Sequence, residues 1–328
     1  MHLSETSIRL SLPYNHDDRF PEWLAAHCEL VGEVYLPIHR AVASTARPWL
    51  GPMNPATYRD RLRRLAPVLR AHGLGANVVI NLLVLWEQRA GVIEEVGRLR
   101  DEVFAELLSV AVADFELGRL LRARFPDLEL SVSTVAEVDS PTRAAYWVDD
   151  VGVGSICISR AINKRLDVIR AIRDLGVKVK MVLDDCCGIA CPSILSHAAL
   201  GSEAGERSGE QPCFARSYVR RRPWLIAQKD VVPATLSRYD GLIDRAKLDG
   251  RVISLESIER KLSLYVAATS WEHPASIYVE PEDAFDRIAG CDRRCPECRW
   301  CEQAFDWRWD KLLPPGEDPG ADRSSIAG

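Results

Sequence analysis

The chain alternates short apolar runs with longer amphipathic stretches, and this alternation constrains its fold more than any other feature. The apolar runs have the length and composition of strands and occur at residues 30–36, 77–85, 107–113, 128–134, 155–159, 177–183, 223–227 and 241–248. Between them lie helical patterns such as 57–73, 115–125 and 162–176, in which apolar residues recur three and four positions apart. A strand followed by a helix, repeated about eight times over roughly 250 residues, predicts a (β/α)8 barrel. A doubly wound open sheet is the alternative.

A barrel of this kind places its functional groups where the strands end. Polar side chains that follow the expected strands are therefore candidates for lining a pocket. They are His39, Arg40, Asn81, Ser133, Thr134, Arg160 and Asn163. These candidates rest on position alone, and a hydrogen bond within a loop is the alternative role for each of them.

The pattern divides the chain into three parts. We expect the barrel to occupy residues 1–270 and to end in a helix over 254–268. A cysteine-rich, metal-binding extension follows at 271–313. The tail at 314–328 is rich in proline, glycine and charge, so we expect it to be disordered.

Composition and charge argue against several classes of protein. Of the 328 residues, 47% are apolar, which is enough to build a core. The net charge is −5 and the one basic run, 220–222, is short, so we expect no nucleic-acid partner. The N-terminal residues lack the pattern of a signal peptide, and no window of about 18 apolar residues occurs. We therefore expect a soluble, cytoplasmic protein with no membrane partner.

The ten cysteines are clustered, which in a reducing cytosol indicates metal binding or redox chemistry rather than disulfides. Cys187 and Cys191 stand four residues apart just after the run at 177–183. Thiolates at such a turn can both reach one soft metal centre. Cys213 is a third candidate ligand, and the neighbouring Cys186 is a weaker one. By contrast, the isolated cysteines at 28 and 157 are expected to be core residues.

A second cluster places four cysteines within eleven residues: Cys291, Cys295, Cys298 and Cys301. Four thiolates suit either zinc or an iron–sulfur cluster. Such a centre would either pass electrons to the barrel or hold the extension onto it. The CxxxCxxC spacing also matches radical S-adenosylmethionine enzymes. That family, however, carries its motif after the first barrel strand and an aromatic residue before the third cysteine, where this chain has Glu297.

Several segments together resemble the U32 peptidase family and its uncharacterised relatives, over roughly residues 28–268. The segments are 128–147, 155–172, 184–197 and 228–251. The most characteristic residues within them are Cys187, Cys191, Pro192, His197, Asp230, Lys247, Gly250 and Arg251. The order and spacing of these residues along a barrel pattern carry the resemblance.

The resemblance implies an iron–sulfur barrel, although members are described as collagenase-like peptidases. Better understood relatives hold a [4Fe-4S] cluster on cysteines and take part in oxygen-independent hydroxylation of quinone precursors or RNA bases, in some cases with prephenate as the oxygen source. The chain departs from the family pattern in two ways that bear on the ligand set and the reaction. The first two cysteines are spaced differently here, and Asp184 stands where relatives of this subgroup usually have asparagine.

We therefore expect a [4Fe-4S] enzyme that hydroxylates or otherwise oxidises or reduces a small metabolite, with a protein partner or electron donor as a further possibility. Cys187, Cys191 and Cys213 would hold the barrel cluster, and Cys186, the C-terminal set or substrate would supply the fourth ligand. The expected catalytic residues are His197, Asp230, Lys247 and Arg251. Among them, Lys247 and Arg251 would hold a carboxylate or phosphate at the end of the eighth strand.

Two alternatives stay open from the sequence. In a U32-type peptidase, the imidazole of His197 would activate Cys187 or Cys191 as the nucleophile. In a non-catalytic subunit, the metal would only stabilise the extension, and the chain would act by binding a partner.

Overall fold

The computed structural model describes residues 3–43, 53–184, 189, 227–249, 254–274 and 278–308. Eight parallel strands close into a barrel in the order of the chain, with β8 hydrogen-bonded to both β7 and β1. The strands are β1 (Arg9–Pro13), β2 (Val31–Pro37), β3 (Gly75–Ile80), β4 (Leu108–Val112), β5 (Glu129–Val132), β6 (Ser155–Cys157), β7 (Lys178–Val182) and β8 (Arg245–Lys247). The predicted (β/α)8 barrel is confirmed.

Two strand assignments from the sequence were wrong. One barrel strand was missed and one run was wrongly predicted as a strand, so the predicted number of eight strands still holds. The barrel begins with β1, a five-residue strand that the apolar pattern missed because Arg9 and Ser11 interrupt it. The run at 223–227 is not a barrel strand, since β7 pairs directly with β8 and Ala227 is helical. Residues 223–226 lie outside the described part of the chain. A short apolar run cannot by itself be assigned to a strand rather than a helix.

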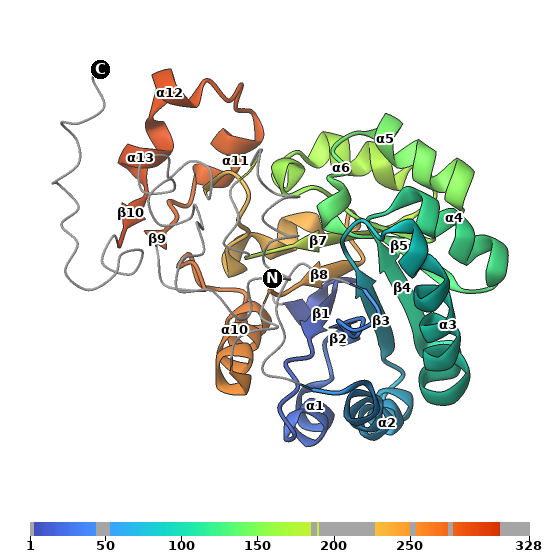
Figure 1. Ribbon diagram of the computed structural model, residues 1–328. Coiled ribbons are helices and arrows are strands. Elements are labelled where there is room, and N and C mark those ends of the chain that lie inside the picture. The colour runs from blue at the N-terminus through green and yellow to red at the C-terminus, as the bar shows by residue number, and fades with distance from the viewer. Residues whose placement is uncertain are drawn as a thin grey trace, which may run out of the picture.

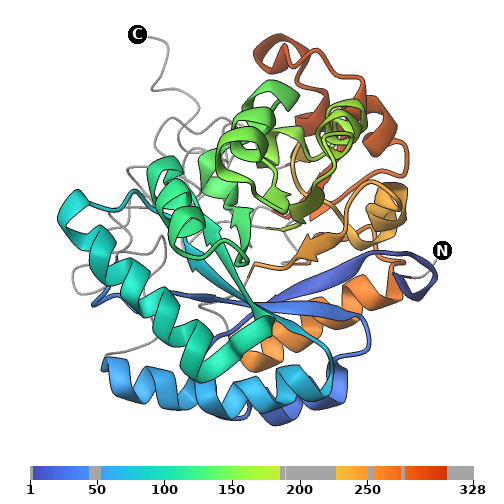
Figure 2. The ribbon, with the colours of Figure 1, turned by 90° about the vertical axis from the view of Figure 1, so that its right-hand side faces the viewer.

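Helices surround the strands, as Figures 1 and 2 show. They are α1 (Phe20–His27), α2 (Pro55–Ala71), α3 (Arg89–Leu99), α4 (Phe115–Arg124), α5 (Pro141–Tyr146), α6 (Leu166–Arg173) and α10 (Leu255–Ala267). Side-chain caps fix where four of them begin. Asn54, Asp114, Ser140 and Ser254 each accept a hydrogen bond from a backbone N–H in the first turn of α2, α4, α5 and α10 respectively.

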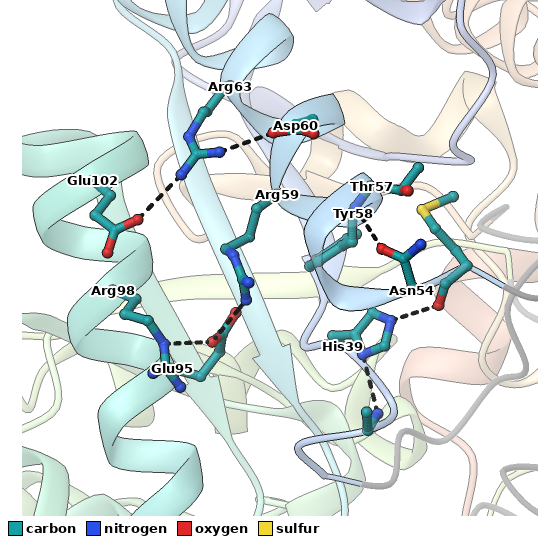
Figure 3. Close-up of polar contacts among 12 residues, drawn as sticks. His39, Asn54, Thr57, Tyr58, Arg59, Asp60, Arg63, Glu95, Arg98 and Glu102 are labelled. Atoms are coloured by element: carbon teal, nitrogen blue, oxygen red, sulfur yellow. Dashed lines mark hydrogen bonds and ion pairs between the residues drawn. The ribbon is translucent and has the colours of Figure 1, made fainter.

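Buried charge joins the helices α2 and α3. The carboxylate of Glu95 is 1% exposed and lies between two guanidinium groups, Arg59 at 3.3 Å and Arg98 at 2.9 Å (Figure 3). A buried carboxylate needs such partners because the loss of its hydration is costly. The contact fixes the spacing of the two helices on the outside of the barrel.

The C-terminal extension forms an appendage on one side of the barrel, away from α1 and α2 (Figure 1). It contains α11 (Ala284–Ala289), α12 (Cys295–Cys298), α13 (Trp300–Ala304) and a two-stranded sheet of β9 (Tyr278–Val279) and β10 (Asp306–Trp307). Its small apolar core includes Ala227 and Val232 from the segment before β8. The appendage therefore packs on the barrel through a shared core. The tail predicted to be disordered, 314–328, lies outside the described residues.

Candidate active site and cysteine pocket

An ion pair crosses the barrel interior. Lys180 Nζ on β7 lies 2.7 Å from Glu33 Oε2 on β2, and Ser11 Oγ on β1 donates to Glu33 Oε1 at 2.7 Å. Strands β7 and β2 are not neighbours in the sheet, so their side chains can meet only inside the barrel. Burial alone would raise the pKa of Glu33, but the charge and hydrogen bond of Lys180, together with Ser11, hold that pKa below its usual value. Glu33 is therefore a buried carboxylate that stays ionised.

Lys247, a predicted catalytic residue, lies at the end of β8 and extends into the barrel. Its Nζ is 3.8 Å from the centre of the Tyr35 ring, a cation–π contact across the interior. The Tyr35 hydroxyl in turn donates to the backbone oxygen of Leu248 at 2.7 Å. Burial raises the pKa of the inward-facing Cys157, while Lys247 and Lys180 act to lower it. Two lysines and one thiol thus lie close together inside the barrel.

A carboxylate that the sequence did not single out contacts the pocket candidate Arg160. Glu137 follows β5 in a left-handed backbone conformation, with φ at 51°. Its carboxylate accepts a hydrogen bond from Ser159 Oγ at 2.5 Å and lies 3.7 Å from Arg160 Nη2. Strained backbone of this kind is costly for a residue with a side chain and gathers at functional sites. Positive φ leaves no trace in the sequence, which explains why Glu137 was missed.

Asp230, another predicted catalytic residue, lies between the barrel and the appendage. It is 1% exposed and forms an ion pair with the adjacent Lys229, and the Nε2 atom of His273 lies 3.0 Å from Asp230 Oδ2. His273 comes from the start of the appendage and carried no signal in the sequence. The geometry makes Asp230 a buried link between the two parts of the protein.

The unusual Asp184 follows β7 and joins it to two other elements. Its Oδ1 accepts a hydrogen bond from the Asp249 N–H at 3.0 Å, and its Oδ2 lies 2.7 Å from Lys261 Nζ on α10. Burial raises the pKa of Asp184 despite Lys261. An asparagine could accept the first contact but would not pair with the charge of Lys261. The aspartate is thus explained by its ion pair.

Four cysteines of the appendage converge on one pocket, called the cysteine pocket below. It is lined by Cys291, Cys295, Cys298 and Cys301, together with Gln228, Arg287, Ile288, Arg299 and Trp300. The backbone turns sharply between the cysteines, with left-handed φ values of 63° at Arg293 and 50° at Arg299. These turns bring thiols from three short segments to one place.

The cysteine pocket has the chemistry of a soft, anionic metal centre. All four candidate donors are sulfur, the ligand type that selects zinc or iron–sulfur clusters. Arg287 and Arg299 line the pocket, and the charge of Lys164 acts to lower the pKa of Cys301. Within the described residues, no three Cys, His, Asp or Glu side chains are positioned to hold a single metal ion. Four thiols that line one pocket are nevertheless the donor set that either a zinc ion or an iron–sulfur cluster takes.

Two of the thiols in this pocket, those of Cys301 and Cys295, are poor nucleophiles when free. Burial raises the pKa of Cys301 to about 12 and also raises that of Cys295. A cysteine nucleophile requires the opposite shift, because only the thiolate attacks. Metal binding would displace these protons and stabilise the thiolates.

Several predicted site residues lie outside the described part of the chain. They are Cys186, Cys187, Cys191, His197, Cys213 and Arg251. Their roles stay predictions. Two of the pocket candidates chosen by position prove to hold backbone in place. His39 Nε2 contacts the backbone oxygen of Met53 at 2.8 Å (Figure 3), and Asn163 Nδ2 donates to the backbone oxygens of Val182 and Lys229.

Comparison with known families matches residues 55–271 to the model of peptidase family U32. The chain belongs to this family. An uncharacterized protease of Methanocaldococcus jannaschii is 26% identical over 219 residues, which are 60% of this chain and 64% of the relative. The chain thus matches less than two thirds of that relative's length. The family match ends at the start of the appendage, before the C-terminal cysteines.

The barrel has likenesses among solved structures. A U32 peptidase structure covers 75% of this chain and 94% of its own, with 17% identity and a TM-score of 0.50. A glycerophosphodiester phosphodiesterase from Parabacteroides distasonis covers 78% and 98%, with 9% identity and a TM-score of 0.42. The likeness to the U32 peptidase structure supports the barrel fold. Among the described residues, no helix is both long enough and apolar enough to cross a membrane.

Proposed function

We propose that this U32-family protein is an iron–sulfur enzyme that carries out oxygen-independent hydroxylation, or a related redox modification, of a small metabolite. The observation that supports it most is the convergence of four thiols in the cysteine pocket, which Arg287 and Arg299 also line. Cys291, Cys295, Cys298 and Cys301 would hold a [4Fe-4S] cluster there, with zinc as the alternative metal. When bound, such a cluster supplies one-electron transfer.

A second cluster on Cys187, Cys191 and Cys213, with Cys186 as a further candidate ligand, is proposed from the family resemblance. Under this proposal the four C-terminal cysteines would hold a centre whose chemistry, one-electron transfer, could serve the barrel, with a protein partner or small electron donor as the source of electrons. Buried contacts join the barrel to the appendage that would hold the C-terminal centre. The 3.0 Å contact between Asp230 Oδ2 and His273 Nε2 is one of them.

The cationic side chains in the barrel favour a small anionic substrate. Lys247 and Arg160 lie at the ends of β8 and β6, where barrels place their active sites. The charges of Lys247 and Arg160 both act to lower the pKa of the buried Cys157 thiol, so both side chains lie near this thiol. We propose that Lys247 and Arg160 bind a carboxylate or phosphate of the substrate, joined by Arg251. Glu137, half-buried beside Arg160, would exchange a proton with the substrate, as would His197.

The family name and that of the archaeal relative favour a second candidate function, peptide hydrolysis. It would require a free thiolate from the barrel set, activated by His197. A cluster on these cysteines would exclude that role, because its sulfurs are bound to iron. The raised pKa of Cys157 and Cys295 argues against either as the nucleophile.

Anaerobic purification tests the proposal. The protein should be brown, with broad absorbance at about 400 nm that dithionite bleaches. It should not cleave peptide substrates. Replacing Cys187 and Cys191 by serine, separately from Cys295 and Cys298, should remove different parts of the absorbance. A colourless protein that cleaves peptides, and loses this activity in the Cys187→Ser or Cys191→Ser variant, would establish the peptidase instead. A colourless protein without activity would favour a non-catalytic partner subunit.

A further inference from the structure

The barrel contributes one hydrogen bond directly to the cysteine pocket. Gln228 Nε2 donates to Cys295 Sγ at a distance of 2.8 Å. Gln228 is 2% exposed, and it belongs to the segment that leads from the barrel loop into β8. The sulfur of Cys295 thus has a buried donor that comes from outside the cysteine-rich extension.

The backbone on either side of Gln228 is held in place. Lys164 Nζ donates to the backbone oxygen of Ala227 at 2.9 Å, and Asn163 Nδ2 donates to that of Lys229 at 2.7 Å. Lys164 and Asn163 are both almost fully buried and belong to the connection between β6 and α6. The amide of Gln228 is therefore aimed at Cys295 by the barrel itself.

We propose that Gln228 is a positioning residue that raises the reduction potential of the centre held in the cysteine pocket. This inference rests on the proposed function. A hydrogen bond to a cysteine sulfur stabilises negative charge on it, and the reduced state of a cluster carries one more negative charge than the oxidised state. The donor therefore favours uptake of one electron from a reductant such as dithionite. Because the barrel fixes the position of Gln228, its effect on the reduction potential depends on the appendage being docked on the barrel.

Replacing Gln228 tests this role through the potential, which a purely structural contribution would leave unchanged once the iron content is matched. In Gln228→Met the side chain keeps its length and loses the donor. The equilibrium constant for one-electron reduction should fall about tenfold, which is about 59 mV in midpoint potential. In Gln228→Glu a carboxylate faces the sulfur, and the potential should fall further. Gln303→Leu, at an exposed glutamine of α13, is the matched control and should keep the wild-type potential.

Equal potentials in wild type and Gln228→Met, at equal iron content, would overturn the inference. A potential higher in Gln228→Glu than in Gln228→Met would overturn it as well. If the wild-type protein holds zinc and no iron, the proposed function fails, and the hydrogen bond is tested on the zinc form. There Gln228→Met should alkylate Cys295 severalfold faster than wild type, because a hydrogen-bonded thiolate is less nucleophilic. An unchanged alkylation rate would show that Gln228 does not act on the Cys295 sulfur, which overturns the premise of the inference independently of the cluster.

Discussion

Lys164 Nζ lies 2.9 Å from Glu280 Oε1, and this ion pair joins the β6–α6 connection to the appendage where both side chains are almost fully buried. The same Lys164 acts on Cys301 in the cysteine pocket. The pair therefore fixes the appendage against the barrel and places a cation beside the thiols. Burial raises the pKa of Glu280 despite Lys164, which shows how much the carboxylate depends on its partner.

Replacing Lys164 by methionine should lower the free energy of unfolding by about 3–5 kcal/mol, because Glu280 is left buried without its counter-ion. The double variant Lys164→Met/Glu280→Gln should recover part of this loss. Arg299→Met removes a pair with Glu302 that is half exposed and should cost about 1 kcal/mol or less. Urea unfolding measures all three. A single variant no less stable than the Arg299→Met control would contradict the role of the pair.

Glu33 predicts a specific pH dependence. Its pKa in the folded protein is below the ordinary value of 4.5, so its contribution to stability is present above that pH and is lost as the pH falls through the folded value. Glu33→Gln should therefore be less stable than wild type at neutral pH, and the difference should shrink as the solution is acidified below 4.5. The exposed Glu297→Gln serves as control, with a small difference at every pH. A Glu33→Gln difference that is independent of pH would contradict the buried ion pair with Lys180.

Two helix glycines should respond differently to alanine. A Cβ at Gly97 in α3 would meet only the Phe125 ring, at 3.4 Å, so Gly97→Ala should stabilise the protein by about 0.5–1 kcal/mol through helix propensity. A Cβ at Gly118 in α4 would lie 3.0 Å from Val151 Cγ1 and 3.4 Å from Val112 Cγ2. Crowding there should cancel the gain or give a net loss of about 1 kcal/mol. Thermal unfolding compares the two, and equal stabilisation would show that α4 has room to move.

The barrel could be predicted from the sequence because apolar strands and amphipathic helices repeat with different periods. The first strand could not, since Arg9 and Ser11 break the apolar run over five residues. Cysteine spacing identified the C-terminal set, and the structure brings all four to one pocket. Side chains that distant segments contribute to the site leave no local pattern in the sequence. Gln228, His273 and Glu137 belong to this group, as their roles follow from backbone conformation and packing that only the fold creates.

The most direct test of the account counts iron and acid-labile sulfide in anaerobically purified protein. Wild type should hold about four or eight iron atoms per chain with matching sulfide. A variant with serine at Cys291, Cys295, Cys298 and Cys301 should lose about four of each, while Cys28→Ser, at a cysteine outside the pocket, should lose none. Iron content that is unchanged in the four-serine variant, or a wild-type protein that holds only zinc or no metal, would contradict the claim that the cysteine pocket carries an iron–sulfur cluster.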